Sequence, residues 1–512
     1  MSLRNFLIDT NVIIHLEDHK KVEPAFSTFT SLASKHKVNV FVHAAARDDL
    51  SRDTNSARRS ISLSKIEKFQ ILEKVRGLTR EQLTADFGKL ARPNDEVDAV
   101  LLHALKINAA DFIVTQDRGL HDRARRHSAD LGRRVLFVPD AVQLLRTTFE
   151  PKDTPVRFIE EVPANSIHLN DTIFDSLREG YPDFDNWWTQ KCVNNHRRCW
   201  IVEDEGIAAI LVRKDETKSD TDATQKFDKI LKICTFKVRP EKRGRKMGEL
   251  LLKKVFWFAQ LNGYGLIYIT TYDTQIALIE LLEYYGFENT SINNKGERIY
   301  EKLISTDRIL PSSNQNRFDT HRQNYPRFIV DGNTEAFGVP IKEDYHDVLY
   351  PDLRQLPNQL DFFDPQGRGN GPKRPGNTIR KVYLCRSQSN LGSAGSLLMF
   401  YKGKSKLAPS QAVTAIGVLE DVGLAKSTNE LHRMTGERSV YSERDLEKWN
   451  ASTERPVKVI NYLLSAYVDP AISIELLKQI GIFKNNPPQS IFKIEYIKLK
   501  KLLSFINLGF KL

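Results

Sequence analysis

The stretch that decides the fold of the central part of this 512-residue chain is ILKICTFKVRPEKRGRKMGELLLKKVFWFAQL, residues 230–261. Apolar and β-branched side chains in Ile230–Val238 predict a strand. Apolar residues at helical spacing in Met247–Leu261 predict a helix. The basic turn between them, Arg239 to Gly248, contains glycine. Backbone N–H groups aimed by such a turn at the start of a helix form an anion site that suits a pyrophosphate.

The flanking sequence predicts a mixed sheet covered by helices. Meander-like strands are expected within residues 199–212, a further strand within 266–271 and a second helix within 276–285. The basic turn by itself has another reading, because a run of Lys and Arg is equally typical of a solvated or nucleic-acid-facing patch.

In this context residues 160–303 resemble the GNAT acyltransferases. Their acetyl-CoA pyrophosphate loop has the form Arg or Gln, two residues, Gly, one residue, Gly or Ala; Arg243 and Gly248 match it, whereas Lys246 replaces the first glycine. Leu281–Phe287 resembles the closing helix of the family with its Gly-Phe. The resemblance implies that acetyl-CoA binds here, at Val238, Arg243, Gly244, Arg245, Lys246, Met247 and Gly248.

This chain departs from the family at the residues that move protons. The family often places a tyrosine acid four residues before the glycine of Gly-Phe, where this chain has Leu282. No glutamate base stands on residues 232–237. Three outcomes stay open for this domain: binding of acyl-CoA, slow acetylation, or a scaffold without turnover.

Carboxylates follow apolar strands in the first part of the chain. Asp9 closes the strand at Phe6–Ile8, and Asp117 follows the strand at 112–115. Strands that alternate with helices predict a parallel sheet, whose sites lie outside the carboxyl ends of the strands. Asp49 and Asp98 fall near helix starts, so four carboxylates can meet at one edge. Each acid taken alone is better explained as a helix cap or a solvated turn residue than as a site residue.

Acids that meet in this way repel one another unless a cation lies among them. All-oxygen ligands favour Mg²⁺ or Mn²⁺, and such a metal activates water against a phosphodiester. Residues 4–145 resemble the PIN-domain ribonucleases through LIDTNVII, FVHAAARDDL, NDEVDAVLLHAL and DFIVTQDRGL, in the order of that family. The resemblance implies an α/β/α parallel sheet and metal-dependent RNA cleavage. By position, the catalytic and metal-binding residues are Asp9, Asp49, Asp98 and Asp117, supported by Asn11, Thr115, Asp95 and Glu96. Asp48 and Asp49 both follow the strand that ends at Val42, and the resemblance favours Asp49, because Leu50 follows it as an apolar residue follows the acid in that family.

The C-terminal part is strand-rich and basic. Apolar runs at 378–386, 396–402 and 412–420 predict strands of a small barrel, which resembles the PUA-like superfamily and its ASCH-type domains. The resemblance implies recognition of RNA or modified bases. Candidate nucleic-acid contacts are Arg380, Lys381 and Arg386 for phosphates and Tyr383 for base stacking. A packing domain without a nucleic-acid partner is the alternative.

Charge and composition bear on the partners. Lys plus Arg (76) exceeds Asp plus Glu (65), giving a net charge of +11, which favours polyanions such as RNA. The four cysteines form no CxxC pair, as expected for reduced thiols. No stretch approaches 18 apolar residues, so we expect no membrane span and a cytoplasmic location.

Together these patterns predict a multidomain α/β and α+β protein. We expect a nuclease domain at 1–150, an acetyl-CoA-binding domain at 156–304, a linker at 305–335 and an RNA-docking domain at 336–512. The main hypothesis is a metal-dependent ribonuclease acting on RNA such as tRNA, a toxin-like or defence effector. The alternatives are an N-acetyltransferase acting on RNA, aminoacyl-tRNA or protein, with the first domain as an RNA clamp, and a non-enzymatic sensor of modified nucleic acid. PIN-like folds often pair, so a homodimer is a further expectation.

Overall fold

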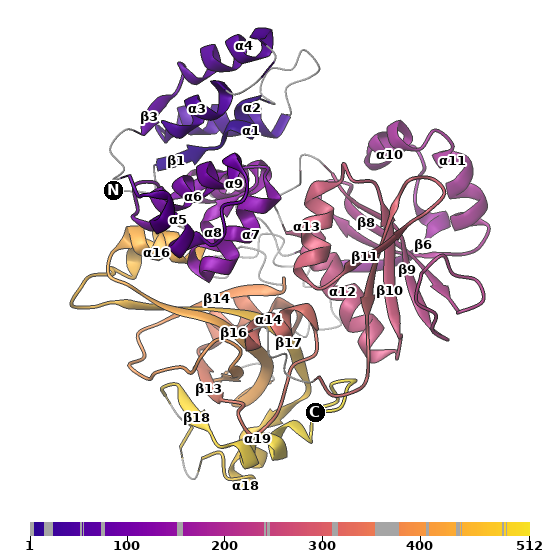
Figure 1. Ribbon diagram of the computed structural model, residues 1–512. Helices are drawn as coiled ribbons and strands as arrows, with labels where there is room; N and C mark the ends of the chain where they lie inside the picture. Colours follow the sequence, from indigo (N-terminus) through magenta and orange to yellow (C-terminus); the bar gives the residue numbers. More distant parts are fainter. Residues whose placement is uncertain are drawn as a thin grey trace. The chain divides into compact units, whose positions relative to one another are not determined.

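The computed structural model describes residues 5–14, 24–51, 54, 56–72, 77–150, 157–239, 242, 246–309, 316–353, 378–405, 409–436, 441, 443–483, 486–487 and 489–512. The chain forms two compact units (Figure 1). The first consists of Met1–Lys152, Leu384–Arg386 and Gly423–Val459; the second consists of Asp153–Tyr383, Ser387–Val422 and Ile460–Leu512.

The first unit is built on a parallel sheet of order β3-β2-β1-β4-β5. Its strands are β1 (Asn5–Ile8), β2 (Asn39–His43), β3 (Gln70–Leu72), β4 (Phe112–Val114) and β5 (Val135–Leu136). Its helices are α1 (Thr10–Ile14), α2 (Pro24–Lys35), α3 (Ala45–Ser51), α4 (Ser56–Ile66), α5 (Arg80–Phe87), α6 (Pro93–Lys106), α7 (Arg118–His127), α8 (Ala129–Arg134) and α9 (Val138–Phe149). The predicted parallel sheet is confirmed.

Helices cover both faces of this sheet, because its strands are apolar on both sides. On one face α2 and α9 pack over Phe6, Ile8 and Val114. On the other, α5, α6 and α7 pack over Leu7 and Ile113. The strand order changes direction between β1 and β4, and the edge beyond the carboxyl ends of these two strands is where an open parallel sheet places its site.

Part of the C-terminal sequence folds with the first unit. The excursion Gly423–Val459 carries α16 (Thr428–Thr435) and α17 (Glu443–Lys448). Arg433 of α16 forms an ion pair of 3.6 Å with Asp111, beside β4. The predicted single C-terminal domain at 336–512 is therefore wrong in this respect, because this excursion packs on the N-terminal unit.

The second unit contains a mixed sheet of order β11-β12-β10-β9-β8-β7-β6. Its strands are β6 (Ile159–Pro163), β7 (Arg198–Glu203), β8 (Ile207–Glu216), β9 (Ile230–Val238), β10 (Leu266–Thr271), β11 (Glu288–Ile292) and β12 (Arg298–Leu303). One face packs on α12 (Met247–Leu261) and α13 (Ile276–Tyr284). The other packs on α10 (Asp175–Gly180), α11 (Phe184–Trp187) and the short helices η1 (Ala164–Ser166), η2 (Thr172–Phe174) and η3 (Trp188–Val193). The predicted mixed sheet is confirmed.

A second sheet in this unit has the order β14-β17-β16-β15-β13-β18. Its strands are β13 (Ala336–Ile341), β14 (Arg380–Cys385), β15 (Leu397–Lys402), β16 (Ala412–Ala425), β17 (Val457–Ser473) and β18 (Phe492–Ile494). Its helices are α14 (Arg317–Gln323), α15 (Glu343–Leu349), η5 (Pro351–Leu353), α18 (Ile474–Gln479) and α19 (Tyr496–Leu503). In the described residues β14 and β18 are not paired, so the barrel expected from sequence is not closed by hydrogen bonds there.

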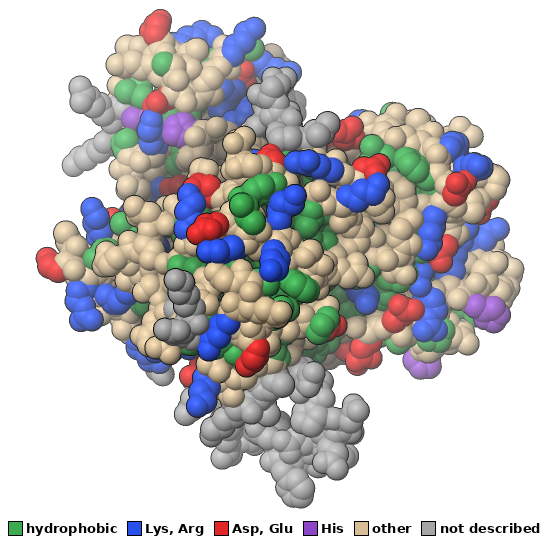
Figure 2. Space-filling model, turned by 90° about the horizontal axis from the view of Figure 1, so that it is seen from below, with side chains coloured by type: hydrophobic (Ala, Val, Ile, Leu, Met, Phe, Trp, Pro, Cys, Tyr) green, Lys and Arg blue, Asp and Glu red, His purple; other side chains and the backbone are tan. Residues whose placement is uncertain are grey.

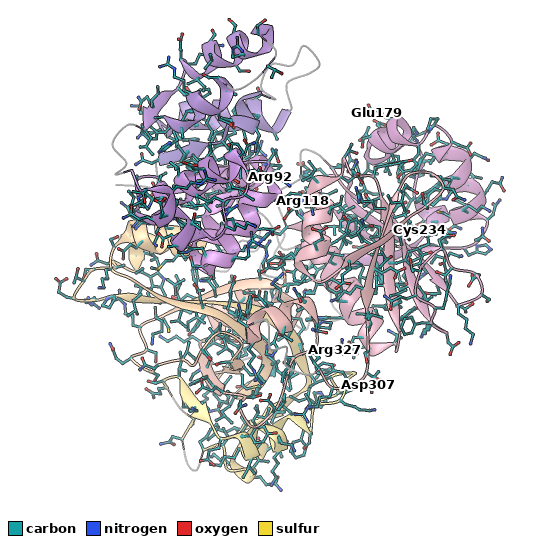
Figure 3. All side chains as sticks on the ribbon, in the orientation of Figure 1. Arg92, Arg118, Glu179, Cys234, Asp307 and Arg327 are labelled. Carbon is teal, nitrogen blue, oxygen red and sulfur yellow. The ribbon has the colours of Figure 1, made fainter. Side chains whose placement is uncertain are left out.

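The described residues of the predicted linker, 305–309 and 316–335, are folded rather than extended between domains. Tyr325 is fully buried, its hydroxyl donates to the carbonyl of Leu464 at 2.7 Å, and Trp257 Nε1 donates to that hydroxyl at 2.9 Å. Arg327 donates to the Asp307 carbonyl at 3.2 Å, and Figure 3 shows both residues. One hydrophobic core runs from α12 and α13 through Tyr325 to β15 and β16. The linker prediction is wrong because this segment fills that shared core.

Candidate active sites

Strands β9 and β10 are parallel neighbours only along the first half of β9. Their pairing runs from Ile230–Leu266 to Ile233–Ile269. On its other side β9 stays paired with β8 as far as Val238–Ala209, but Cys234 is an extra residue there: Thr235 faces Val212 and Ile233 faces Arg213. Cys234, labelled in Figure 3, is therefore the extra residue of a β-bulge, which bends a strand. The second half of β9 is thus not paired with β10, and a strand edge of this kind can pair with an extended ligand.

Helix α12 begins beside the end of β9. Lys246, its N-cap, has φ 57° and ψ 18°, the left-handed region that glycine adopts at the lowest cost. This explains why the GNAT pattern has glycine at this position. The first N–H groups of the helix have no partner within it and give its start a positive potential. Arg243, Gly244 and Arg245 lie outside the described residues.

Gly248 allows α12 to start close to its neighbours. A Cβ there would lie 3.3 Å from Leu281 Cδ2 and 3.6 Å from the Phe236 ring. Met247 is buried, and Val238 packs against the same core. The described residues of the predicted cofactor-binding set, Val238, Lys246, Met247 and Gly248, therefore lie together where β9 ends and α12 begins.

One polar stripe of α12 is bound by the C-terminal part of the same unit. Glu249 accepts hydrogen bonds from the backbone N and Nε of Arg380, at 2.7 and 2.8 Å. Lys253, one turn further, donates to Asp352 at 2.6 Å. Trp257, another turn on, donates to Tyr325. Residues four apart share one face of a helix, so this whole face of α12 is packed against other parts of the protein.

The position of the family's tyrosine acid carries no proton donor. Leu282 is fully buried in the core. The neighbouring Tyr285 is also buried, and burial raises the pKa of its hydroxyl well above the usual value. Cys234 faces Arg197 Nη1 at 3.4 Å, and burial raises the pKa of its thiol. A base or acid for acetyl transfer therefore does not follow from the family pattern.

In the first unit three acids of the predicted quartet, Asp9, Asp98 and Asp117, couple electrostatically, and Asp49 is linked to Asp9 through Thr10. Asp9 follows β1, is buried, and accepts hydrogen bonds from Thr115 Oγ1 at 2.7 Å and Asn11 Nδ2 at 2.8 Å. Thr10 Oγ1 lies 3.2 Å from Asp9 Oδ1 and 3.0 Å from Asp49 Oδ2, so it joins these two acids. Asp117 caps α7 by accepting from Gly119 N at 2.6 Å.

Asp98, on the buried face of α6, carries the largest electrostatic signal of this cluster. Burial, followed by the nearby charges of Asp9 and Asp117, raises its pKa to about 8. Burial also raises the pKa of Asp9, and the charge of Asp117 adds to that effect. Within the described ranges, however, no three His, Cys, Asp or Glu side chains converge closely enough to hold a metal ion. The carboxylates are thus coupled, but they do not form a finished ligand set for Mg²⁺ or Mn²⁺.

The two acids among the predicted supporting residues have local roles. Asp95 accepts from the backbone N of Ala91 and Arg92, at 2.8 and 2.9 Å, and so caps α6. It also pairs with Arg123 at 3.2 Å. Glu96 is exposed and lies 3.9 Å from Arg80, a weak surface pair.

The four predicted nucleic-acid contacts are engaged inside the protein. Lys381 is buried and donates to the Leu349 carbonyl at 2.6 Å, so it cannot reach a phosphate from this position. Tyr383 is buried and donates to the Pro340 carbonyl at 3.2 Å. Arg380 pairs with Glu249, and Arg386 donates to the Arg455 carbonyl at 3.0 Å. These placements differ from the expected phosphate-binding surface because the side chains bond to carbonyl and carboxylate groups of the protein. On the face in Figure 2, Lys and Arg are interspersed with Asp and Glu.

The sequence did not reveal the residues that position the acids or balance their charge. Thr10 stands inside the Asp9-Thr10-Asn11 run, where its hydroxyl was a visible candidate. Arg123, whose charge lowers the pKa of Asp98, gave no signal beyond a basic helix. The pairing of Glu249 with Arg380 spans 131 positions, and no local pattern predicts it.

Comparison with known proteins finds relatives for one part of the second unit. Residues 164–287 match the model of the acetyltransferase (GNAT) family. A segment of 53 residues is 38% identical to an uncharacterized N-acetyltransferase of Schizosaccharomyces pombe; the match covers 10% of this chain and 32% of the yeast protein. The chain thus spans about a third of the length of this curated relative. The central part of the chain is therefore similar to GNAT acetyltransferases over residues 164–287.

Solved structures resemble two parts of the chain at low identity. ASCH from Zymomonas mobilis is 17% identical, with a TM-score of 0.24, and the match covers 34% of this chain and 96% of that one. Arabidopsis thaliana NAA60 in complex with acetyl-CoA is 14% identical, with a TM-score of 0.22, and the match covers 29% and 99%. In the described part of the chain, no helix is both long and apolar enough to cross a bilayer.

Proposed function

We propose that the second unit is an N-acetyltransferase that takes the acetyl group from acetyl-CoA. One observation carries the proposal: the region matched by the GNAT model includes the point where β9 leaves β10 and α12 begins. The N-acetyltransferase class of the yeast relative supports transfer to an amine.

The chain offers two kinds of group to this donor. The first N–H groups of α12, which have no partner within the helix, suit the pyrophosphate, and the edge of Cys234–Val238 that lies beyond the pairing with β10 suits the amides of the pantetheine arm. Acetyl-CoA supplies the acetyl thioester. The small Gly248 and the left-handed Lys246 set the path of the backbone where the phosphates approach.

The reaction class is attack of a neutral amine on the thioester carbonyl, which releases CoA as a thiol. A thiol with a pKa of about 8.5 leaves readily as the thiolate, so the lack of a tyrosine at Leu282 does not prevent transfer. The net charge of +11 favours polyanionic acceptors, which makes RNA and aminoacyl-tRNA the first acceptors to test and protein the next.

The test is acetyl transfer from radiolabelled acetyl-CoA to three separate pools: total RNA, aminoacyl-tRNA and protein. We expect label in at least one pool, lost in Lys246→Glu, which reverses the charge at the phosphate turn. The matched control is Lys254→Glu, because Lys254 is exposed on the same helix. Equal transfer by wild type and Lys246→Glu would remove this turn from the donor site.

A second candidate is metal-dependent RNA cleavage by the first unit, as the resemblance to PIN-domain ribonucleases implies. The observation that favours it is the mutual coupling of Asp9, Asp98 and Asp117. A divalent cation among them would neutralise this charge, and RNA incubated with Mn²⁺, Mg²⁺ or EDTA tests the idea. Cleavage that needs metal and disappears in Asp98→Asn supports it, whereas intact RNA under every condition contradicts it.

A further inference from the structure

The first turn of α12 contains a buried carboxylate, that of Glu249. Glu249 is the third residue of α12, so it lies within one turn of the N–H groups offered to the donor phosphates. An acid in a first turn is favourable to the helix itself. Towards a bound pyrophosphate the same charge is repulsive, and its buried position keeps water from screening it.

The C-terminal part of the unit neutralises this carboxylate. Arg380, at the start of β14, donates its backbone N–H to one oxygen of Glu249 and its Nε–H to the other, at 2.7 and 2.8 Å. The exposed fractions of the two side chains are 21% for Arg380 and 2% for Glu249. Both oxygens are thereby turned towards β14. Arg380 contributes most among the neighbouring charges that lower the pKa of Glu249, and Lys246 comes next.

The charges around the pair have the sign that phosphates need. Lys246, Lys253 and Lys381 each couple electrostatically with Glu249, and Asp352 is the second acid near Lys253 and Lys381. Lys246 comes from the turn and Arg380 from β14, so two segments far apart in the sequence supply the positive charge that faces Glu249. Without Arg380 the electrostatic potential at the start of α12 would become more negative, because the carboxylate of Glu249 would lose its main counterion.

We infer that Arg380 is a positioning residue of the acetyl-CoA site, which acts by neutralising Glu249 and so makes the C-terminal part of the chain a component of the acetyltransferase. The inference rests on the proposed function, because it presupposes that the donor phosphates bind at the start of α12. Binding of acetyl-CoA would then require β14, which lies outside residues 164–287 that match the GNAT model. Arg380 thus serves the donor site rather than an RNA backbone.

The experiment measures binding of acetyl-CoA to the full chain by calorimetry. We expect Arg380→Ala to weaken binding about tenfold, as for an interaction of about 1.4 kcal/mol. Arg380→Ala combined with Glu249→Gln should regain most of the affinity, because the repulsive charge is gone. The control Arg298→Ala removes an equivalent guanidinium from an exposed pair with Asp273 and should leave binding unchanged.

A phosphate-free donor separates this role from a general loss of structure. S-acetylpantetheine, followed by ligand-observed NMR, should bind wild type and Arg380→Ala alike. If Arg380→Ala weakens the binding of both ligands equally, Arg380 only supports the fold and the inference is overturned. Unchanged affinity of Arg380→Ala for acetyl-CoA would overturn it as well. If folded wild type binds no acetyl-CoA at all, the proposed function itself fails, which is a different outcome from either of these.

Discussion

The ammonium nitrogen of Lys253, in the middle of α12, lies 2.6 Å from a carboxylate oxygen of Asp352 in η5. The hydroxyl of Tyr467 donates to the same oxygen at 3.0 Å. Burial lowers the pKa of Lys253, and Asp352 opposes that effect. Helix α12 is therefore fixed to the C-terminal part of its unit by an ion pair in which only 6% of the lysine side chain is exposed.

Asp352→Asn should lower the free energy of unfolding of the second unit by about 3 kcal/mol, because it leaves the buried Lys253 without its counterion. Urea unfolding followed by tryptophan fluorescence measures this, since four of the five tryptophans lie in the second unit. The double variant with Lys253→Met should recover most of the loss. A single variant as stable as wild type would show that the pair is dispensable.

Lys246→Gly should raise the free energy of unfolding by about 1 kcal/mol, because it relieves the left-handed backbone of a non-glycine residue. The matched change Lys254→Gly lies in the interior of the same helix and should lower it by about 1 kcal/mol. Urea unfolding of both variants checks the opposite signs. Destabilisation by both would contradict the left-handed assignment of Lys246.

Stability of the first unit should fall as the pH rises towards 8, because of Asp98. Its pKa is about 8 in the folded chain against an ordinary value of 3.8, so the folded state binds more protons between these values. Asp98→Asn should therefore gain stability relative to wild type as the pH increases from 5 to about 8. Hydrogen exchange of the α6 amides at both pH values measures it. An equal difference at the two pH values would contradict the raised pKa.

Stability of the second unit should rise with pH above neutrality, because of Lys302. This buried lysine donates to the carbonyls of Tyr285 and Gln323, both at 2.6 Å. Burial lowers its pKa from 10.5 to about 7, so the unfolded chain binds more protons between these values and unfolding becomes harder as the pH increases. Lys302→Met should flatten this dependence, while the exposed control Lys295→Met should not. Thermal unfolding at pH 7 and about 9 compares them.

Local sequence patterns predicted the elements on either side of the basic turn well. The strand at Ile230–Val238 and the helix at Met247–Leu261 form with the predicted bounds, since each has an unbroken apolar pattern. The acids at the ends of β1 and β4 come together because parallel strands end at one edge. The folded segment around Tyr325 and the role of Arg380 were not predictable, because both depend on partners more than 100 positions away.

The most direct test of the central claim is calorimetric titration of the full chain with acetyl-CoA, beside S-acetylpantetheine as the phosphate-free donor. We expect saturable binding of acetyl-CoA at one site per chain, and binding of S-acetylpantetheine at least about tenfold weaker, because the start of α12 holds the phosphates. A folded chain that binds neither compound, or binds both equally, would contradict the placement of the donor at β9 and α12.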